Sequence, residues 1–330
     1  MKAIAVMGAF AGEEDLAGRI LCHDLSPRLR KGTVLGPQHL EEVRAAGEVH
    51  LVELEPGDVH EDDAARRLAA ALCSPGLDAR GPLQSQMRLH ALTRGLLRVD
   101  AGAVDRINRL GPASVFTLVD GQAVDAGEEI AGCKVTPVAV PRTVLETVEA
   151  ICREAPPVLS LIGFRSLRTF VVVTEKLKPR ARQIFAAALT KKLGWYGAEL
   201  LQVREVERSG DHVRAAYREA LSSGAELILF AGASSIDPLD PAYRELSGAG
   251  GELLHLGAPA HPGSMLWLGS LGAAAVLGIA SCAGFGRNTS LDLLLPFVFA
   301  YGRPHLEDVV RLGHGGLIES SAGRRFPPYT

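Results

Sequence analysis

The sequence lacks the closely spaced cysteine pairs that disulfide frameworks and structural zinc sites use. Its five cysteines are odd in number and widely scattered, and no CxxC pair occurs among them. This pattern indicates reduced thiols and a cytoplasmic protein. HExxH, GxSxG and Walker motifs are also missing, so the chain offers none of the patterns typical of zinc peptidases, serine hydrolases or P-loop enzymes.

The chain also lacks an excess of positive charge. A net charge of −3 with 22% charged residues gives no bulk attraction to nucleic acid or to an anionic membrane, so we expect neither as a partner. The N-terminus has too short an apolar run for a signal peptide and reaches an acidic residue at Glu13. We therefore do not expect secretion.

One long uncharged run, residues 265–286, is long enough to cross a membrane. Glycines and serines interrupt it repeatedly, which favours two short buried strands joined by a turn. We therefore expect no membrane span.

The length of 330 residues allows two or three domains. Pro156 and Pro157 cannot continue a helix, and they mark the expected boundary between residues 1–157 and 158–330. The first part is predicted to be a smaller, β-rich α+β region. It includes a helix over 61–72 with acidic residues in its first turn, strands over 114–119 and 130–138, and helices over 38–46, 99–110 and from Pro141.

The second part alternates strands and helices, which predicts a mostly parallel sheet in a three-layer α/β/α domain. The expected strands are 169–174, 199–206 and 225–231, and the expected helices are 179–193, 211–222 and 238–246. Further strands are predicted at 253–256, 265–268 and 276–279, the last two as a hairpin, before a helix over 289–301.

The strongest candidate site is the segment Ala225–Asp240. An almost continuous apolar strand is followed directly by small residues, a proline and two acids. In open α/β sheets, ligands bind beyond the carboxyl ends of strands and near helix N-termini, which favour anions. The alternative is an ordinary turn in which Ser235 or Asp237 caps a helix that begins with Pro238.

Other loops could complete an anion pocket. The segment 281–290 follows another apolar strand and contains Cys282, which suits either a ligand contact or a buried thiol, and Arg287, which suits either an anion or plain surface exposure. The turn 257–265 contains His261 and an abrupt HPG bend. Glu175 lies at the end of the domain's first strand, with Lys176 and Lys178 following it.

These segments together resemble a known family. VVVTEK, AELILFAGASSIDPLDP, GGELLHLGAPAHPGSMLWLG and VLGIASCAG are similar, in this order, to the molybdopterin-binding domain shared by molybdenum cofactor biosynthesis proteins of the MoeA and MogA type. The similarity covers residues 165–300. The upstream segments GRILCHDL, LEPGDVHEDDAARRLAAAL and KVTPVAVP resemble the corresponding region of a less characterised subfamily.

The resemblance implies a pocket for molybdopterin or the molybdenum cofactor. The implied binding residues are Gly232, Ala233, Ser234, Ser235, Glu175, Pro262, Gly263, Ser281, Cys282, Ala283 and Arg287. Asp237 and Asp240 are the candidate catalytic residues and Mg²⁺ ligands, and a nucleotide is a further candidate ligand. The family also implies a homo-oligomer and a partner that is a molybdoenzyme or another cofactor-biosynthesis protein.

The candidate loop departs from the family pattern. Members carry a threonine and two adjacent glycines where this chain has Phe230, Ala231, Gly232 and Ala233. The methyl group of Ala233 leaves less room for a phosphate against the backbone. Binding is therefore the expected function, while an adenylyl- or molybdo-transferase, a non-catalytic carrier, and an unrelated nucleotide or sugar-phosphate enzyme remain open alternatives.

Overall fold

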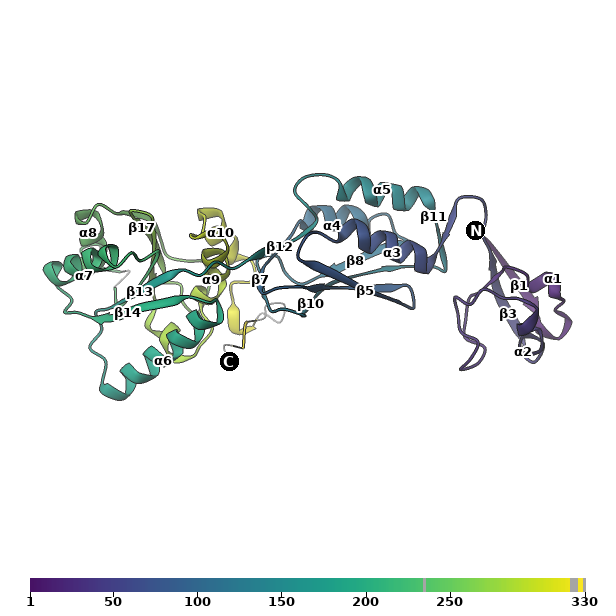
Figure 1. Ribbon diagram of the computed structural model, residues 1–330, viewed down its shortest axis with the longest axis horizontal. Helices are drawn as coiled ribbons and strands as arrows, with labels where there is room; N and C mark the ends of the chain where they lie inside the picture. Colours follow the sequence, from purple (N-terminus) through teal and green to yellow (C-terminus); the bar gives the residue numbers. More distant parts are fainter. Residues whose placement is uncertain (234–235, 321–325, 329–330) are drawn as a thin grey trace. The chain divides into compact units, whose positions relative to one another are not determined.

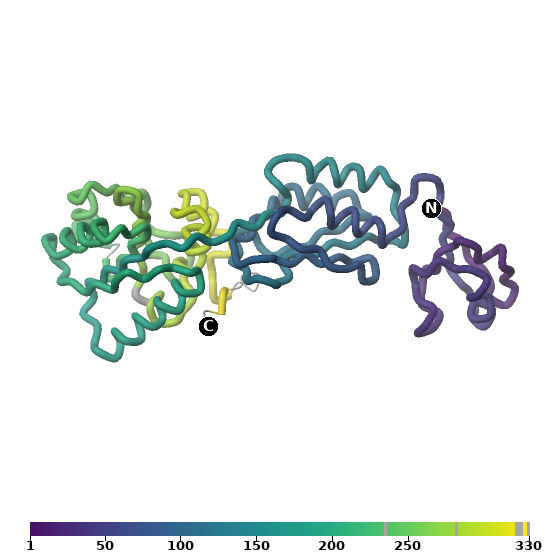
Figure 2. Tube along the Cα trace, viewed as in Figure 1, coloured from purple at the N-terminus to yellow at the C-terminus, as the bar shows by residue number. Residues whose placement is uncertain are grey.

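The computed structural model describes residues 1–233, 236–320 and 326–328. The chain divides into two compact units. The first comprises residues 1–92, 98–120 and 126–161, and the second comprises 93–97, 121–125 and 162–330. Figures 1 and 2 follow the chain through both units. The strands β12 (Leu159–Gly163), β7 (Gly95–Val99) and β9 (Ala123–Val124) form a three-stranded sheet in that order.

The first unit begins with a small antiparallel sheet of order β1-β3-β2, made of Lys2–Met7, Glu48–Glu53 and Ile20–Leu21. The helices α1 (Glu13–Leu16) and α2 (Leu40–Arg44) accompany it. Leucines and valines from these elements form one buried cluster. An isolated bridge between Ile20 and Val34 adds to this sheet.

A second sheet of the first unit has the order β5-β6-β10-β8. Its strands are Leu77–Leu83, Gln86–Ala91, Glu129–Val135 and Ala113–Thr117. The helices α3 (Glu61–Leu72), α4 (Ala101–Asn108) and α5 (Arg142–Cys152) lie on one side of these strands (Figure 1). The short strands β4 (Asp58–His60) and β11 (Ala139–Pro141) pair nearby.

The helix predicted over 61–72 is confirmed at both ends. The strands β5 and β6 were not predicted, because a glycine and a proline inside 77–83 resemble a turn. In β6, Met87, Leu89 and Ala91 are buried and alternate with more exposed polar residues. This period of two directs the three buried side chains toward the face of the sheet on which the helices lie.

The second unit contains a six-stranded sheet of order β14-β13-β15-β18-β17-β16. These strands are Glu199–Glu205, Arg168–Val173, Leu227–Ala231, Ala274–Ile279, Trp267–Leu271 and Glu252–Leu256. The first four are mutually parallel, and β17 and β16 are antiparallel additions. The predicted mostly parallel sheet and the predicted hairpin within 265–286 are both confirmed.

Helices cover both faces of this sheet, which confirms the three-layer α/β/α prediction. On one face, Phe170 and Val172 of β13 pack with α7 (Gly210–Ser222) and α8 (Pro241–Gly248). On the other, Val171 and Val173 pack with α6 (Pro179–Trp195) and α9 (Ser290–Tyr301). Each fully buried side chain of this size contributes about 1.5–3 kcal/mol of transfer free energy. Among the described residues, no helix is long and apolar enough to cross a membrane.

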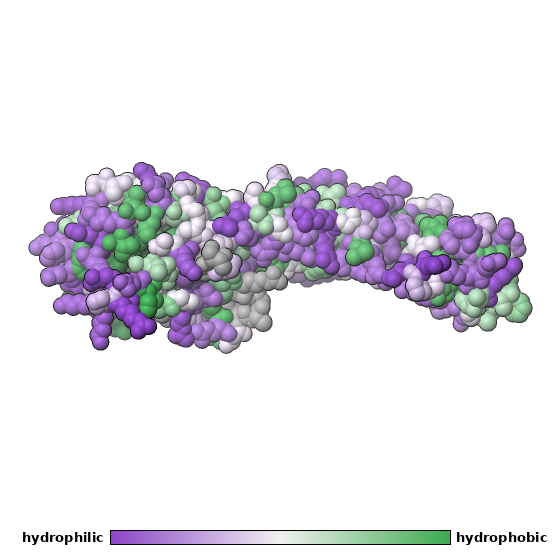
Figure 3. Space-filling model, turned by 60° about the horizontal axis from the view of Figure 1, so that its bottom comes forward, coloured by the Kyte–Doolittle hydropathy of each residue, from purple (hydrophilic) through white to green (hydrophobic). Residues whose placement is uncertain are grey.

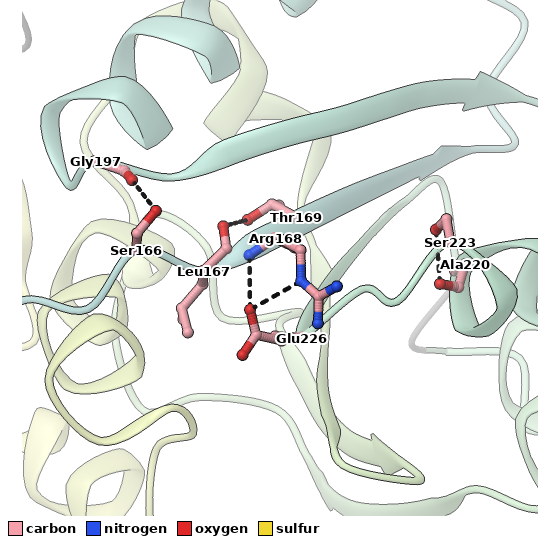
Figure 4. Close-up of polar contacts among 8 residues, drawn as sticks. All are labelled: Ser166, Leu167, Arg168, Thr169, Gly197, Ala220, Ser223 and Glu226. Atoms are coloured by element: carbon pink, nitrogen blue, oxygen red, sulfur yellow. Dashed lines mark hydrogen bonds and ion pairs between the residues drawn. The ribbon is translucent and has the colours of Figure 1, made fainter.

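Polar contacts connect the segments at the N-terminal ends of the parallel strands (Figure 4). The backbone N–H and the guanidinium of Arg168 donate to the carboxylate of Glu226, at 3.2 and 3.4 Å, and Ser166 donates to the carbonyl of Gly197 at 2.9 Å. The backbone N–H of Arg168 and then its guanidinium lower the pKa of Glu226. These contacts fasten the start of β13 to the segment that leads into β15.

Candidate functional site

The carboxyl ends of three parallel strands meet at one edge of the second unit's sheet. The register aligns Val173 of β13 with Ala231 of β15, and Ala231 with Ile279 of β18. The loops that follow these three residues therefore begin side by side. β17 runs antiparallel to β18, with Trp267 opposite Gly278, so the turn that precedes β17 reaches the same edge.

Gly232 joins two of these loops by close packing. Its φ of +101° is a conformation that side-chain-bearing residues rarely adopt, and a Cβ there would lie 2.6 Å from Oγ1 of Thr174 and 2.8 Å from Cγ of Glu175. The backbone N–H of Thr174 also donates to the carbonyl of Ala231 at 2.9 Å. Two predicted site residues, Gly232 and Glu175, are therefore in contact, and only glycine fits at position 232.

The loop between β15 and α8 exposes one acid and buries the other. Asp237 is exposed, and its carboxylate accepts the backbone N–H of Leu239 at 2.9 Å. Ala233 is half-buried, and Ser234 and Ser235 lie outside the described residues. Asp237 is therefore the carboxylate of this loop that solvent and a ligand can reach.

Asp240 anchors the next helix. Its side chain is 1% exposed, one oxygen accepts the N–H of Ala242 at 2.8 Å as the N-cap of α8, and the other is ion-paired with Arg208. The helix thus begins at Pro241, and the prediction that it begins at Pro238 is wrong. The sequence repeats Asp-Pro at both places, so the cap pattern alone could not choose between them.

Tyr217 of α7 also contacts the start of α8, close to Asp240. The hydroxyl of Tyr217 donates to the carbonyl of Ala242 at 2.9 Å. Burial, and then the charge of Asp240, raise the pKa of Tyr217 well above its usual value. The phenol therefore stays protonated as a hydrogen-bond donor that holds the start of α8.

The HPG turn is tied to the N-terminus of α9. Ser290 donates through its hydroxyl to the carbonyl of Gly263 at 2.6 Å and through its N–H to the carbonyl of Pro262 at 3.0 Å. Gly263 has a φ of +105°, and a Cβ there would lie 2.4 Å from the Ser290 hydroxyl. The predicted residues Pro262 and Gly263 therefore contact the second predicted loop, 281–290. His261 is exposed.

The loop after β18 begins with the 3₁₀ helix η3 (Ser281–Phe285). The side chains of Ser281 and Cys282 lie outside the described ones. Ala283 is fully buried in the core that includes α6. Arg287 is exposed and pairs with Glu319, also exposed, at 3.0 Å. The structure thus places Ala283 in the core and Arg287 at the surface.

A buried ion pair that the sequence analysis missed supports this loop. Lys192 and Asp292 have side chains that are 4% and 0% exposed, and their charged atoms lie 2.7 Å apart. Lys192 also donates to the carbonyl of Arg287 at 2.8 Å, and Asp292 accepts the N–H of Thr289 at 2.7 Å. The Thr-x-x-Asp capping pattern was the available sequence signal.

Positive charge gathers beside the end of β13. Lys176 and Lys178 are exposed, and neither ammonium group has an ion pair or hydrogen bond with any residue that the structure describes. Lys178 directly precedes the N-terminus of α6, whose first turn has no acidic residue. Helix N-termini and lysines both stabilise anions. In the described part of the chain, no group of three or more His, Cys, Asp or Glu residues could hold a metal.

No family model and no curated protein matches this sequence. Among solved structures, a MogA structure is 20% identical over 44% of this chain and 100% of that chain, with a TM-score of 0.31. The molybdopterin biosynthesis MoeA protein from Pyrococcus horikosii is 14% identical over 68% of this chain and 74% of that chain, with a TM-score of 0.28.

The molybdopterin biosynthesis Mog protein from Mycobacterium ulcerans is 16% identical over 41% of this chain and 94% of that chain, with a TM-score of 0.29. These structures carry names from the same family that the sequence resembles.

Proposed function

We propose that the second unit binds the phosphate end of molybdopterin, or of the molybdenum cofactor, at the carboxyl edge of its sheet. The observation that carries this proposal is the meeting of three strand ends, at Val173, Ala231 and Ile279, beside exposed lysines. Ligand sites of open α/β sheets lie at such edges.

The residues present fit an anionic group. Lys176, Lys178 and the N-terminus of α6 supply positive charge at the end of β13, and Gly232 keeps the neighbouring loop close to the sheet. A phosphate monoester would be held by these cations and by backbone N–H groups of the loop. When bound, molybdopterin supplies a dithiolene that holds molybdenum.

The two acids take different parts in this proposal. Asp237 is exposed and could share a Mg²⁺ ion with a bound phosphate, because Mg²⁺ is held by one or two carboxylates plus phosphate oxygens. Both oxygens of Asp240 are already engaged, by Arg208 and by the N-terminus of α8. We therefore propose that Asp240 positions the loop and that Asp237 is the carboxylate available for chemistry.

The experiment titrates the full chain with molybdopterin under anaerobic conditions and obtains the Kd from the change in fluorescence. Replacing Lys176 and Lys178 together with alanine removes two charges from the rim and should raise the Kd about tenfold or more, because hydrogen bonds to charged groups contribute about 1.5–3 kcal/mol. Lys191→Ala is the control, since this exposed lysine lies in the last turns of the same helix.

The result that would count against the proposal is equal affinity in all three proteins, or no saturable binding by the wild type. Adding ATP, Mg²⁺ and molybdate to the pterin-bound protein separates the alternatives of transferase and carrier. Turnover supports a transferase, whereas tight binding without turnover supports a carrier that passes the cofactor to another protein.

A further inference from the structure

The first unit carries a cluster of basic side chains on the face of its four-stranded sheet that points away from α3. In β6, Arg88 points away from α3, because its neighbours Met87 and Leu89 are buried. Arg80 of β5 is directly opposite Arg88, and Lys134 of β10 is directly opposite Gln86. Residues that are opposite each other, or two apart on one strand, share a face. Three cations therefore lie on one side of the sheet.

These residues surround a cavity. Its volume is about 470 Å³, within the usual range for small-molecule sites, and it is lined by Arg80, Gly81, Leu83, Gln84, Gln86, Arg88, His90 and Lys134. In Figure 3 the surface over these strands, near the middle of the view, is mostly hydrophilic. A concave, charged surface of this size suits a small polar ligand better than a flat partner surface.

The charges in the cavity are only partly balanced. Arg80 pairs with Asp78 at 3.0 Å, and Arg88 lies 3.6 Å from Glu129. Lys134 is half-buried, and its ammonium group has no ion pair or hydrogen bond with any residue that the structure describes. Like charges directly opposite each other destabilise a strand pair. The opposition of Arg80 and Arg88 therefore works against the stability of the sheet, and an anion between them would relieve it.

Two further groups equip the cavity for a ligand. His90 follows Arg88 on the same face, and its Nδ1 is buried without a hydrogen-bond partner among the described residues. Gly132 lies opposite Arg88 on one side and Phe116 on the other. The Phe116 ring covers this glycine, since a Cβ there would lie 2.4 Å from the ring, and the ring is 45% exposed. An apolar ring thus lies next to the cations.

We propose that this cavity binds a phosphorylated small molecule, with its phosphate held by Arg80, Arg88 and Lys134. Guanidinium groups match phosphate oxygens in pairs, and a lysine adds a point charge. This site is in the first unit, so its ligand is separate from the pterin proposed for the second unit.

The test is isothermal titration of the full chain with inorganic phosphate, AMP and ATP in separate experiments. The double variant Arg88→Gln with Lys134→Gln should weaken binding at least tenfold. Arg106→Gln is the control, because Arg106 is an exposed arginine of the same unit that lies on helix α4 and pairs with Glu154. Tighter binding of AMP than of phosphate would identify a nucleotide-like ligand, and equal binding would identify the phosphate alone.

Stability distinguishes a binding role from a structural one. Because Arg88→Gln removes one of two opposed guanidiniums, it should leave the thermal midpoint unchanged or raise it while it weakens binding. The proposal is overturned if none of inorganic phosphate, AMP and ATP binds saturably at millimolar concentration. It is also overturned if Gly232→Ala, in the second unit, abolishes the phosphate binding while Arg88→Gln with Lys134→Gln leaves it intact.

Discussion

Replacing Lys192 with methionine should strongly destabilise the second unit. The methionine side chain fills a similar space but leaves the carboxylate of Asp292, which is 0% exposed, without its charge partner. Breaking a buried ion pair on one side costs about 3–5 kcal/mol. The variant also loses the hydrogen bond from Lys192 of α6 to the carbonyl of Arg287, which holds the loop after η3 against α6.

Urea unfolding followed by tryptophan fluorescence measures this effect selectively. Both tryptophans of the chain, Trp195 and Trp267, lie in the second unit. With an m value of about 2 kcal/mol/M, a loss of about 4 kcal/mol lowers the midpoint by about 2 M. Arg204→Met is the control, because its ion pair with Glu219 is 49% and 39% exposed and such pairs contribute about 1 kcal/mol or less.

A double variant, Lys192→Met with Asp292→Leu, tests the reason for the loss. Removing both charges should recover much of the stability, because no buried charge is left unpaired. The N-cap interaction of Asp292 with Thr289 is then missing and should still cost about 1 kcal/mol. A loss below about 1 kcal/mol for Lys192→Met, or a double variant less stable than either single one, would refute the reasoning.

Two further predictions concern titratable groups. Burial raises the pKa of Cys133 to about 12, so at pH 8 this thiol should resist iodoacetamide in the folded protein and react in urea; equal rates by peptide mass spectrometry would contradict the burial. The folded pKa of Glu226 is lowered by Arg168, so its stabilising effect is present above the unfolded pKa of about 4.3 and is lost as the pH falls through the folded value. In the Glu226→Gln variant the urea midpoint should therefore change less between about pH 5 and pH 3 than in the wild type. An equal change of the midpoint with pH in both proteins would rule out this pair as a source of acid sensitivity.

The strands and helices of the second unit could be predicted because their patterns are strong. Leu227–Ala231 is buried on both faces, so it is apolar throughout, and its neighbours alternate with helices of ordinary length. The start of α8 could not be fixed in the same way, since Asp237-Pro238 and Asp240-Pro241 offer the same cap chemistry. Only the ion pair with Arg208, distant in sequence, distinguishes Asp240.

The first unit was harder to predict, for a physical reason. β5 contains Gly81 and Pro82, and β6 alternates buried residues with the more exposed Arg88 and His90 on its other face. Such half-exposed strands lack the apolar run that marks a buried one. The basic cavity depends on the register of three strands, which the sequence does not reveal, so Arg80, Arg88 and Lys134 could not be connected beforehand.

The candidate site was predicted as a set of loops, but their contacts were not. The sequence pointed to Gly232, Pro262 and Gly263 as separate small residues, whereas their close packing against Glu175 and Ser290 depends on the strand order. The Thr-x-x-Asp pattern indicates that Asp292 caps a helix. Its ion pair with Lys192 joins two helices that are distant in sequence, and no local pattern indicates that pairing.

The most direct test of the central claim compares two glycine variants by their Kd for molybdopterin. Gly232 and Gly224 both have positive φ, at +101° and +74°, and they lie beyond opposite ends of the same strand, β15. A methyl group should strain either turn, but only Gly232→Ala alters the proposed pocket. A Kd raised about tenfold or more for Gly232→Ala, with a wild-type Kd for Gly224→Ala, is the predicted result; equal Kd values for both variants and the wild type would contradict the account.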